Sequence, residues 1–112
     1  MVNMAKKHDR ILMVGQFSRF QSGYRYLFEK INKNVYGMLK KLYLYRKTAP
    51  IWGISDNLIM DLLIHEFDYV SWFIGKITSV QSHVMLNSQG FISDELAIIH
   101  NSNSLAIVEG SN

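Results

Sequence analysis

The sequence contains no cysteine and a single proline among its 112 residues. The absence of cysteine excludes disulfide bonds, thiolate metal sites and thiol catalysis, and it fits a cytoplasmic protein. One proline and seven glycines are too few for a fibrous or low-complexity chain. With 48% hydrophobic and 19% charged residues, the composition predicts at most one folded domain, large enough to bury a core.

Long hydrophobic runs are also absent. The first ten residues are polar, and the apolar run after them, residues 11–14, is far too short for the core of a secretory signal. The longest apolar region is interrupted by Asp61, His65, Glu66 and Asp68, which argues against a membrane span. We therefore expect no membrane partner and a cytoplasmic location.

Acidic residues are scarce in the first half of the chain. Residues 1–50 hold eleven Lys or Arg against two acids, a net charge of +9, whereas residues 51–112 hold one Lys against seven acids, a net charge of −6. Such asymmetry indicates either an anionic partner, or else two halves that face each other or positive charges on a solvated face. Because no nucleic-acid-binding motif accompanies the charge, we favour facing halves or a solvated face over an anionic partner, and we expect no nucleic-acid partner.

Several nucleotide-binding and catalytic motifs are missing as well. The sequence has no P-loop, no G-x-G-x-x-G, no G-x-S-x-G and no internal repeat. The chain therefore cannot hold a dinucleotide by itself in the usual Rossmann manner.

Residues 56–75 form the most informative stretch and predict one helix, capped by Ser55 or Asp56 and ended by Gly75. Its apolar residues recur at helical spacing on one arc. They are Ile59, Leu63, Phe67, Val70 and Ile74. Most residues that flank this arc are apolar too, so we expect the helix to be buried and its remaining polar stripe to face a cleft.

That polar stripe consists of Asp61, His65, Asp68 and Trp72. Asp61 and His65 are one helical turn apart at i, i+4, and His65 and Asp68 are neighbours at i, i+3. A carboxylate beside an imidazole can fix its tautomer and raise its basicity, which suits a general acid or base. The same pattern also describes an ordinary helix with a solvated or structurally satisfied stripe, and spacing alone leaves both interpretations open.

The remaining elements predict an α+β fold. Helices are expected over residues 2–9 and 22–34, the second with a core-facing stripe of Phe20, Tyr24, Leu27, Phe28 and Ile31. Residues 11–14 predict a short strand buried on both faces. Further strands are expected over residues 38–47, 77–85, 95–100 and 105–109, the last two joined by a turn at residues 101–104. We expect an open, mainly antiparallel sheet with both main helices on one face.

Three other residues are weaker candidates for a site. Trp52 stands in the loop before the central helix, where α/β folds often place ligand contacts. Arg19 and Arg46 are candidate substrate contacts, with exposure or a structural ion pair as the alternative. A metal cage built from histidines on distant segments has no supporting H-x-H or H-E-x-x-H spacing, so we expect no metal site.

Two motifs together resemble the glucose–fructose oxidoreductase / inositol dehydrogenase family. They are Gly15-Gln16-Phe17-Ser18-Arg19-Phe20 and Asp61-x-x-x-His65-x-x-Asp68-x-x-x-Trp72-x-x-Gly75. The later run DELAIIHNSNSLAIVEGS is similar to a hairpin of that family, and the resemblance covers residues 5–111.

The resemblance implies a protein with an N-terminal Rossmann domain that binds NAD or NADP and a C-terminal domain with a large open sheet. Such proteins oxidise or reduce a hydroxyl or carbonyl of a sugar, cyclitol or similar small molecule. His65 matches the general acid/base of the family, and Asp61 matches the residue that orients the substrate or the imidazole. The i, i+3 spacing, and not the resemblance, is the reason to expect that Asp68 supports His65 as a neighbouring carboxylate.

The sequence departs from the family in lacking both its Glu-Lys-Pro lysine and its glycine-rich nucleotide loop. Residues 1–15 correspond to the last helix and strand of the Rossmann domain, and residues 16–112 to a partial substrate and dimerisation domain. We therefore expect no cofactor to bind this chain alone, no turnover by it, and a homodimer formed through the sheet. The alternative is a non-enzymatic interaction module that uses the open sheet face.

Overall fold

The computed structural model describes residues 1–47 and 58–111, apart from the side chains of Met60 and Asp61. Its helices are α1 (Val2–Lys7), α2 (Ser22–Asn32) and α3 (Ile64–Ile74), with a short 3₁₀ turn η1 (Phe17–Phe20) and a π-helical segment η2 (Leu58–Leu63). Its strands are β1 (Lys41–Lys47), β2 (Ser79–Leu86), β3 (Ile92–His100) and β4 (Leu105–Ser111).

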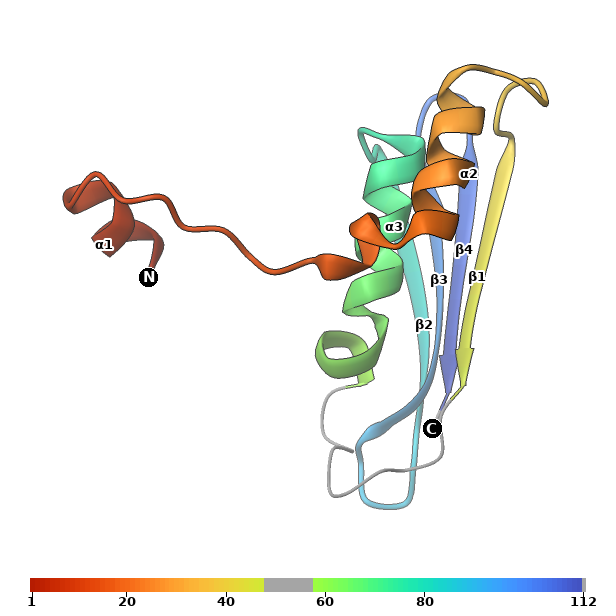
Figure 1. Cartoon of the computed structure of the whole chain (residues 1–112). Coiled ribbons are helices and arrows are strands. Elements are labelled where there is room, and N and C mark those ends of the chain that lie inside the picture. The colour runs from red at the N-terminus through yellow and green to blue at the C-terminus, as the bar shows by residue number, and fades with distance from the viewer. Residues whose placement is uncertain (48–57, 112) are drawn as a thin grey trace.

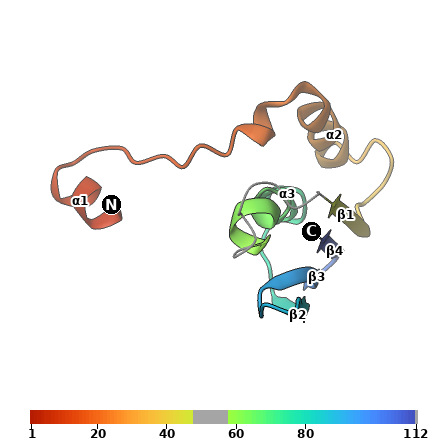
Figure 2. The same cartoon turned by 90° about the horizontal axis from the view of Figure 1, so that it is seen from below.

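The strands form one open sheet in the order β1-β4-β3-β2. Strand β1 runs parallel to β4, and the other two pairings are antiparallel. Helices α3 and α2 lie on the same face of this sheet, with α2 beside α3, and no described helix covers the other face (Figures 1 and 2). The predicted α+β architecture is therefore confirmed.

The β3–β4 hairpin follows from its turn residues. The Asn101 side-chain oxygen accepts hydrogen bonds from the backbone N–H groups of Asn103 at 2.8 Å and Ser104 at 2.7 Å. The Asn101 N–H closes the loop on the Ser104 carbonyl at 3.0 Å. An asparagine that replaces backbone partners in this way is typical of tight turns. The predicted turn at residues 101–104 is confirmed.

The core lies between α3 and the middle of the sheet. From the helical side it contains Leu58, Leu63, Tyr69, Val70, Phe73 and Ile74, and from the sheet Ala97, Ile99, Ala106 and Val108. Three members of the predicted apolar arc, Leu63, Val70 and Ile74, are buried as expected. The small Ala97 and Ala106 on the central strands let α3 approach the sheet closely.

The central helical segment changes from a π-helix to an α-helix part-way along. Residues Leu58–Leu63 are π-helical, and the regular α-helix begins at Ile64. A π turn holds more residues than an α turn, so it rotates the side chains before it relative to those after it. The helix ends at Gly75, as predicted. The backbone φ of this residue is 76°, a value that favours glycine. The predicted caps Ser55 and Asp56 lie outside the described residues.

The prediction for residues 11–14 is wrong. This segment is not a strand, and its side chains are exposed, Ile11 at 99% and Met13 at 79%. It runs as an extended arm from α1 towards η1 (Figure 1). A strand needs a neighbour to pair with its backbone. No strand of the described residues lies beside this arm, so local apolar character alone could not bury it.

Helix α2 is less buried than its aromatic stripe predicted. Phe20 is 73% exposed, and Tyr24 and Leu27 are exposed as well, whereas Phe28 and Ile31 pack partly against the core. The reason is that α2 lies alongside α3 at the edge of the helical layer, so only a narrow side of it is covered (Figure 2). The helix ends at Asn32, two residues earlier than predicted, and the chain turns through Asn34 and Gly37 with positive φ.

Among the described residues, no helix has the length and apolar character needed to cross a membrane.

Candidate functional site

His65 stands in the first turn of α3 and is half-buried. Its Nδ1 lies 3.4 Å from the side-chain oxygen of Gln16, at the end of the extended arm. The ring of Phe17 meets the imidazole edge-on, with centroids 5.8 Å apart and planes at 66°. The imidazole is thus held between α3 and a segment 49 residues earlier in the chain.

Asp68 lies about one turn further along α3 and binds Arg19. The guanidinium donates from Nε at 2.7 Å and from Nη2 at 2.5 Å, a bidentate geometry that adds both energy and direction. These hydrogen bonds raise the pKa of Arg19 above its usual range. The predicted support of His65 by Asp68 is therefore not what the geometry presents, because this carboxylate is held by Arg19.

Between these two contacts, Ser18 is buried against α3. Burial raises the pKa of Tyr69 above its ordinary value, and a hydrogen bond with Ser18 partly offsets that rise. The turn η1 is thus fixed to α3 by side chains that follow one another in sequence.

Arg46 is held on the sheet side of the same helix. Its guanidinium lies 2.5 Å (Nη2) and 2.7 Å (Nε) from one oxygen of Glu66, whose side chain is 6% exposed. Burial of a carboxylate is costly unless a cation accompanies it, so the pair fixes how α3 sits on β1. Arg19 and Arg46 were candidate substrate contacts, with a structural ion pair as an alternative, and each of them forms such an ion pair. These pairs also join the basic first half of the chain to the acidic second half.

Gly110 provides the space that seats η2 on the sheet. It is paired with Arg46 on β1 and with Glu95 on β3, so the three residues form one row across the helix-covered face. A methyl group added at Gly110 would lie 2.5 Å from a Leu63 methyl carbon. The Leu63 side chain therefore occupies the place that a side chain at position 110 would take.

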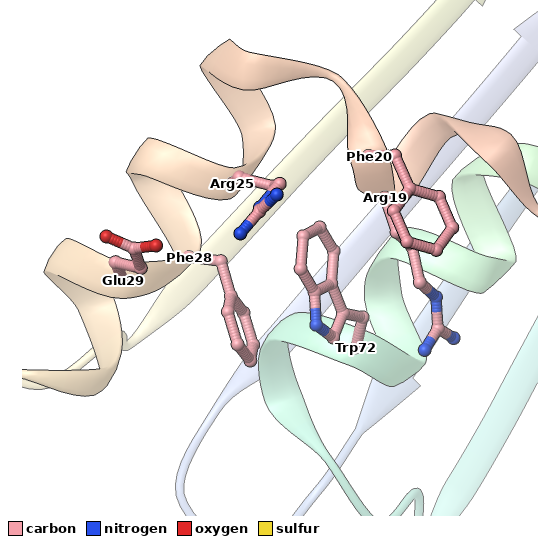
Figure 3. A pocket seen from close by; sticks show the side chains of 6 residues that line it. All are labelled: Arg19, Phe20, Arg25, Phe28, Glu29 and Trp72. Carbon is pink, nitrogen blue, oxygen red and sulfur yellow. The ribbon is translucent and has the colours of Figure 1, made fainter.

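A groove opens at the other end of the polar stripe. It has a volume of about 440 Å³ and is lined by Arg19, Phe20, Arg25, Phe28, Glu29 and Trp72 (Figure 3). Trp72 stacks on Phe28 at 4.3 Å between centroids, and the Arg19 guanidinium lies 5.8 Å from the Trp72 ring on the opposite side (Figure 3). The polar stripe of the helix was predicted to face a cleft. Trp72 of that stripe lines this groove, whereas His65 does not.

The structure leaves two predicted site residues undescribed. Asp61 falls within η2, but its side chain lies outside the described part of the chain, and so does all of Trp52. Across residues 1–47 and 58–111, no group of three His, Asp or Glu side chains could hold a metal ion. A cage of distant histidines is therefore not formed by the described residues.

Sequence reasoning missed Gln16, Phe17 and Glu66 as parts of this region. The first two belong to a motif that carried the resemblance, yet nothing local indicated that they reach His65. Glu66 could have been found, because it is the acid that falls on the apolar side of the helix and must have a cationic partner when buried.

Comparisons with solved structures agree with this architecture. A candidate myo-inositol dehydrogenase from Sinorhizobium meliloti matches 99% of the chain with a TM-score of 0.86 and 18% sequence identity. An oxidoreductase from Agrobacterium radiobacter, in complex with NAD⁺, L-tartaric acid and magnesium, matches 98% of the chain with a TM-score of 0.81 and 15% identity. A UDP-N-acetylglucosamine 3-dehydrogenase from Acidithiobacillus ferrooxidans matches 99% with a TM-score of 0.78 and 23% identity.

The chain has the fold of part of these dehydrogenases. It spans 38%, 35% and 36% of their lengths, respectively. The family resemblance drawn from the two sequence motifs is thereby confirmed at the level of the fold. No protein-family model and no curated protein matches the sequence.

Proposed function

We propose that this chain is the substrate-binding and oligomerisation part of a cytoplasmic, NAD(P)-dependent oxidoreductase that acts on a sugar, a cyclitol or a related polyol. Residues 1–15 would be the end of its nucleotide-binding domain, and residues 16–112 part of its C-terminal domain. The observation that carries the proposal is the placement of His65. It lies beside Gln16 and Phe17 on the helix that bears the resembling motif, in a fold that dehydrogenases share.

In this proposal His65 is the general acid/base. It takes the proton from the substrate hydroxyl in the oxidation and returns a proton to the carbonyl oxygen in the reverse reaction. Asp61, one turn earlier, orients the substrate or the imidazole. The half-buried position of His65 supports this role, because such a site can exchange protons with a substrate while partly excluding water.

We expect neither NAD nor NADP to bind this chain alone. The sequence lacks a glycine-rich loop before a helix, which is how backbone N–H groups approach a pyrophosphate. We therefore assign no NAD or NADP contact to this chain and expect it to show no turnover alone. Reduction of either nucleotide by the purified chain with any sugar or inositol would contradict that expectation.

Substrate binding tests the central proposal without the cofactor. Ligand-observed NMR of the purified chain against inositols, hexoses and sugar acids should detect at least one binder, and His65→Ala should weaken it by roughly ten-fold. His8→Ala is the matched control, because His8 is exposed just after α1. Equal binding by both variants, or no binder at all, would refute the proposed site.

The proposed homodimer would form through the open sheet face. This face carries exposed Tyr43 and Tyr45 on β1 and Leu96 on β3, beside the partly buried Ile98 and Ile107. Leu96→Lys should shift the chain to monomer in sedimentation velocity, because it places a charge in that apolar face. Val80→Lys on β2 is the control, since Val80 is exposed on the other face. A wild-type monomer would overturn the dimer.

A non-enzymatic interaction module remains the second candidate, favoured by the same exposed aromatic side chains on β1. The two candidates differ in what His65 does. A module would keep its binding partner when His65 is replaced and lose it when Leu96 is replaced, whereas the oxidoreductase part would show the reverse for its small-molecule ligand.

A further inference from the structure

The segment before α2 is fixed to α3 more firmly than its exposed arm would suggest. Arg19 forms the bidentate ion pair with Asp68, Ser18 is buried with only 6% of its surface exposed, and η1 lies across the N-terminal half of α3. These contacts hold η1, which directly follows Gln16, against α3, and so they place the Gln16 side chain beside His65.

The acids that follow His65 on α3 already have cationic partners. Glu66 turns to the sheet and binds Arg46, and Asp68 binds Arg19. The described contact at Nδ1 of His65 is instead the side-chain oxygen of Gln16 at 3.4 Å. The edge of Phe17 limits rotation of the ring from another side. An amide oxygen accepts but cannot donate, so this contact acts as a hydrogen bond when Nδ1 carries the proton.

We propose that Gln16 is a positioning residue for His65. It accepts a hydrogen bond from Nδ1–H, which leaves Nε2 as the unprotonated nitrogen that faces the substrate. This inference rests on the proposed acid/base role of His65, and it explains how a neutral side chain provides the orientation that a carboxylate gives in other histidine sites. Unlike a carboxylate, the neutral amide fixes the tautomer without placing its own negative charge next to the reacting hydroxyl.

The tautomer is measured directly in the chain as it stands. Two-bond ¹H–¹⁵N correlation spectra of the ¹⁵N-labelled protein, recorded well above the ordinary histidine pKa of about 6.5, distinguish Nδ1–H from Nε2–H. His8, His83 and His100 serve as internal references. We expect His65 to carry its proton on Nδ1, and Gln16→Met, which keeps the length but removes the acceptor, to shift the tautomer ratio towards Nε2–H by roughly three- to ten-fold.

Two further variants complete the test. Gln16→Glu retains an acceptor oxygen and should retain the Nδ1–H form, and Gln21→Met makes the same chemical change at an exposed residue and should leave the spectrum of His65 unchanged. A proton on Nε2 in the wild type, or a ratio that Gln16→Met does not change, overturns the inference. The ligand-binding test with His65→Ala is independent, so failure of the proposed function and failure of this hydrogen bond are distinguishable.

Discussion

The contact between Gly110 and Leu63 gives the sharpest test of how the site helix is held on the sheet. Leu63 is 0% exposed and immediately precedes α3, two residues before His65. Atoms of its side chain lie 2.5, 2.8 and 2.9 Å from where a Cβ at position 110 would be. A methyl group cannot be accommodated at these distances unless the Leu63 side chain moves, and a fully buried leucine moves only by repacking against its neighbours.

The expected magnitudes follow from this geometry. Gly110→Ala should destabilise the fold by about 1–2 kcal/mol, because overpacking costs roughly 1–3 kcal/mol and the loss of glycine flexibility in the unfolded chain returns part of it. Leu63→Ala should cost about 2–5 kcal/mol through lost burial and the cavity that remains. In the double variant the new methyl group partly fills that cavity, so the two effects should not add.

Urea unfolding followed by circular dichroism measures all four members of this cycle. We expect the double variant to be more stable than the sum of the single changes by about 1–2 kcal/mol. Ala97→Gly on β3 combined with Leu63→Ala provides a comparison in which a methyl group is removed from the same face. Additivity of Gly110→Ala and Leu63→Ala within about 0.5 kcal/mol would refute the proposed packing.

Two further predictions concern buried ionisable groups. Arg46→Met should destabilise the fold by about 3 kcal/mol in urea unfolding, because it leaves the buried Glu66 unpaired. Adding Glu66→Leu to Arg46→Met should recover most of that loss. The control Lys41→Met, at an exposed residue of the same strand, should have little effect. Since burial raises the pKa of Tyr69, the unfolded chain loses that proton first above about pH 10, and stability falls until the folded-state pKa is passed. Tyr69→Phe should therefore lose less stability than the wild type between about pH 9 and pH 11. Tyr26→Phe, at an exposed tyrosine, should lose as much stability as the wild type over the same range. Equal losses in the two variants would contradict the assignment.

Short-range patterns in the sequence determined much of the fold. Helical spacing of apolar residues predicted α3 and the burial of Val70 and Ile74, and Asn101 predicted the hairpin turn. These features depend on neighbours within one or two turns of the chain, so composition and spacing contain nearly all the information needed. The order of the strands and the parallel pairing of β1 with β4 were not contained in those patterns.

Only the tertiary structure decided the surroundings of His65. Its contact with Gln16 and the pairing of Asp68 with Arg19 each join residues 49 positions apart, and that of Glu66 with Arg46 joins residues 20 apart. The exposure of residues 11–14 was also beyond local reasoning, because an apolar run is buried only where another segment covers it. Spacing along a helix shows which side chains share a face, but the partners of that face come from how distant segments dock, and long-range packing determines that docking.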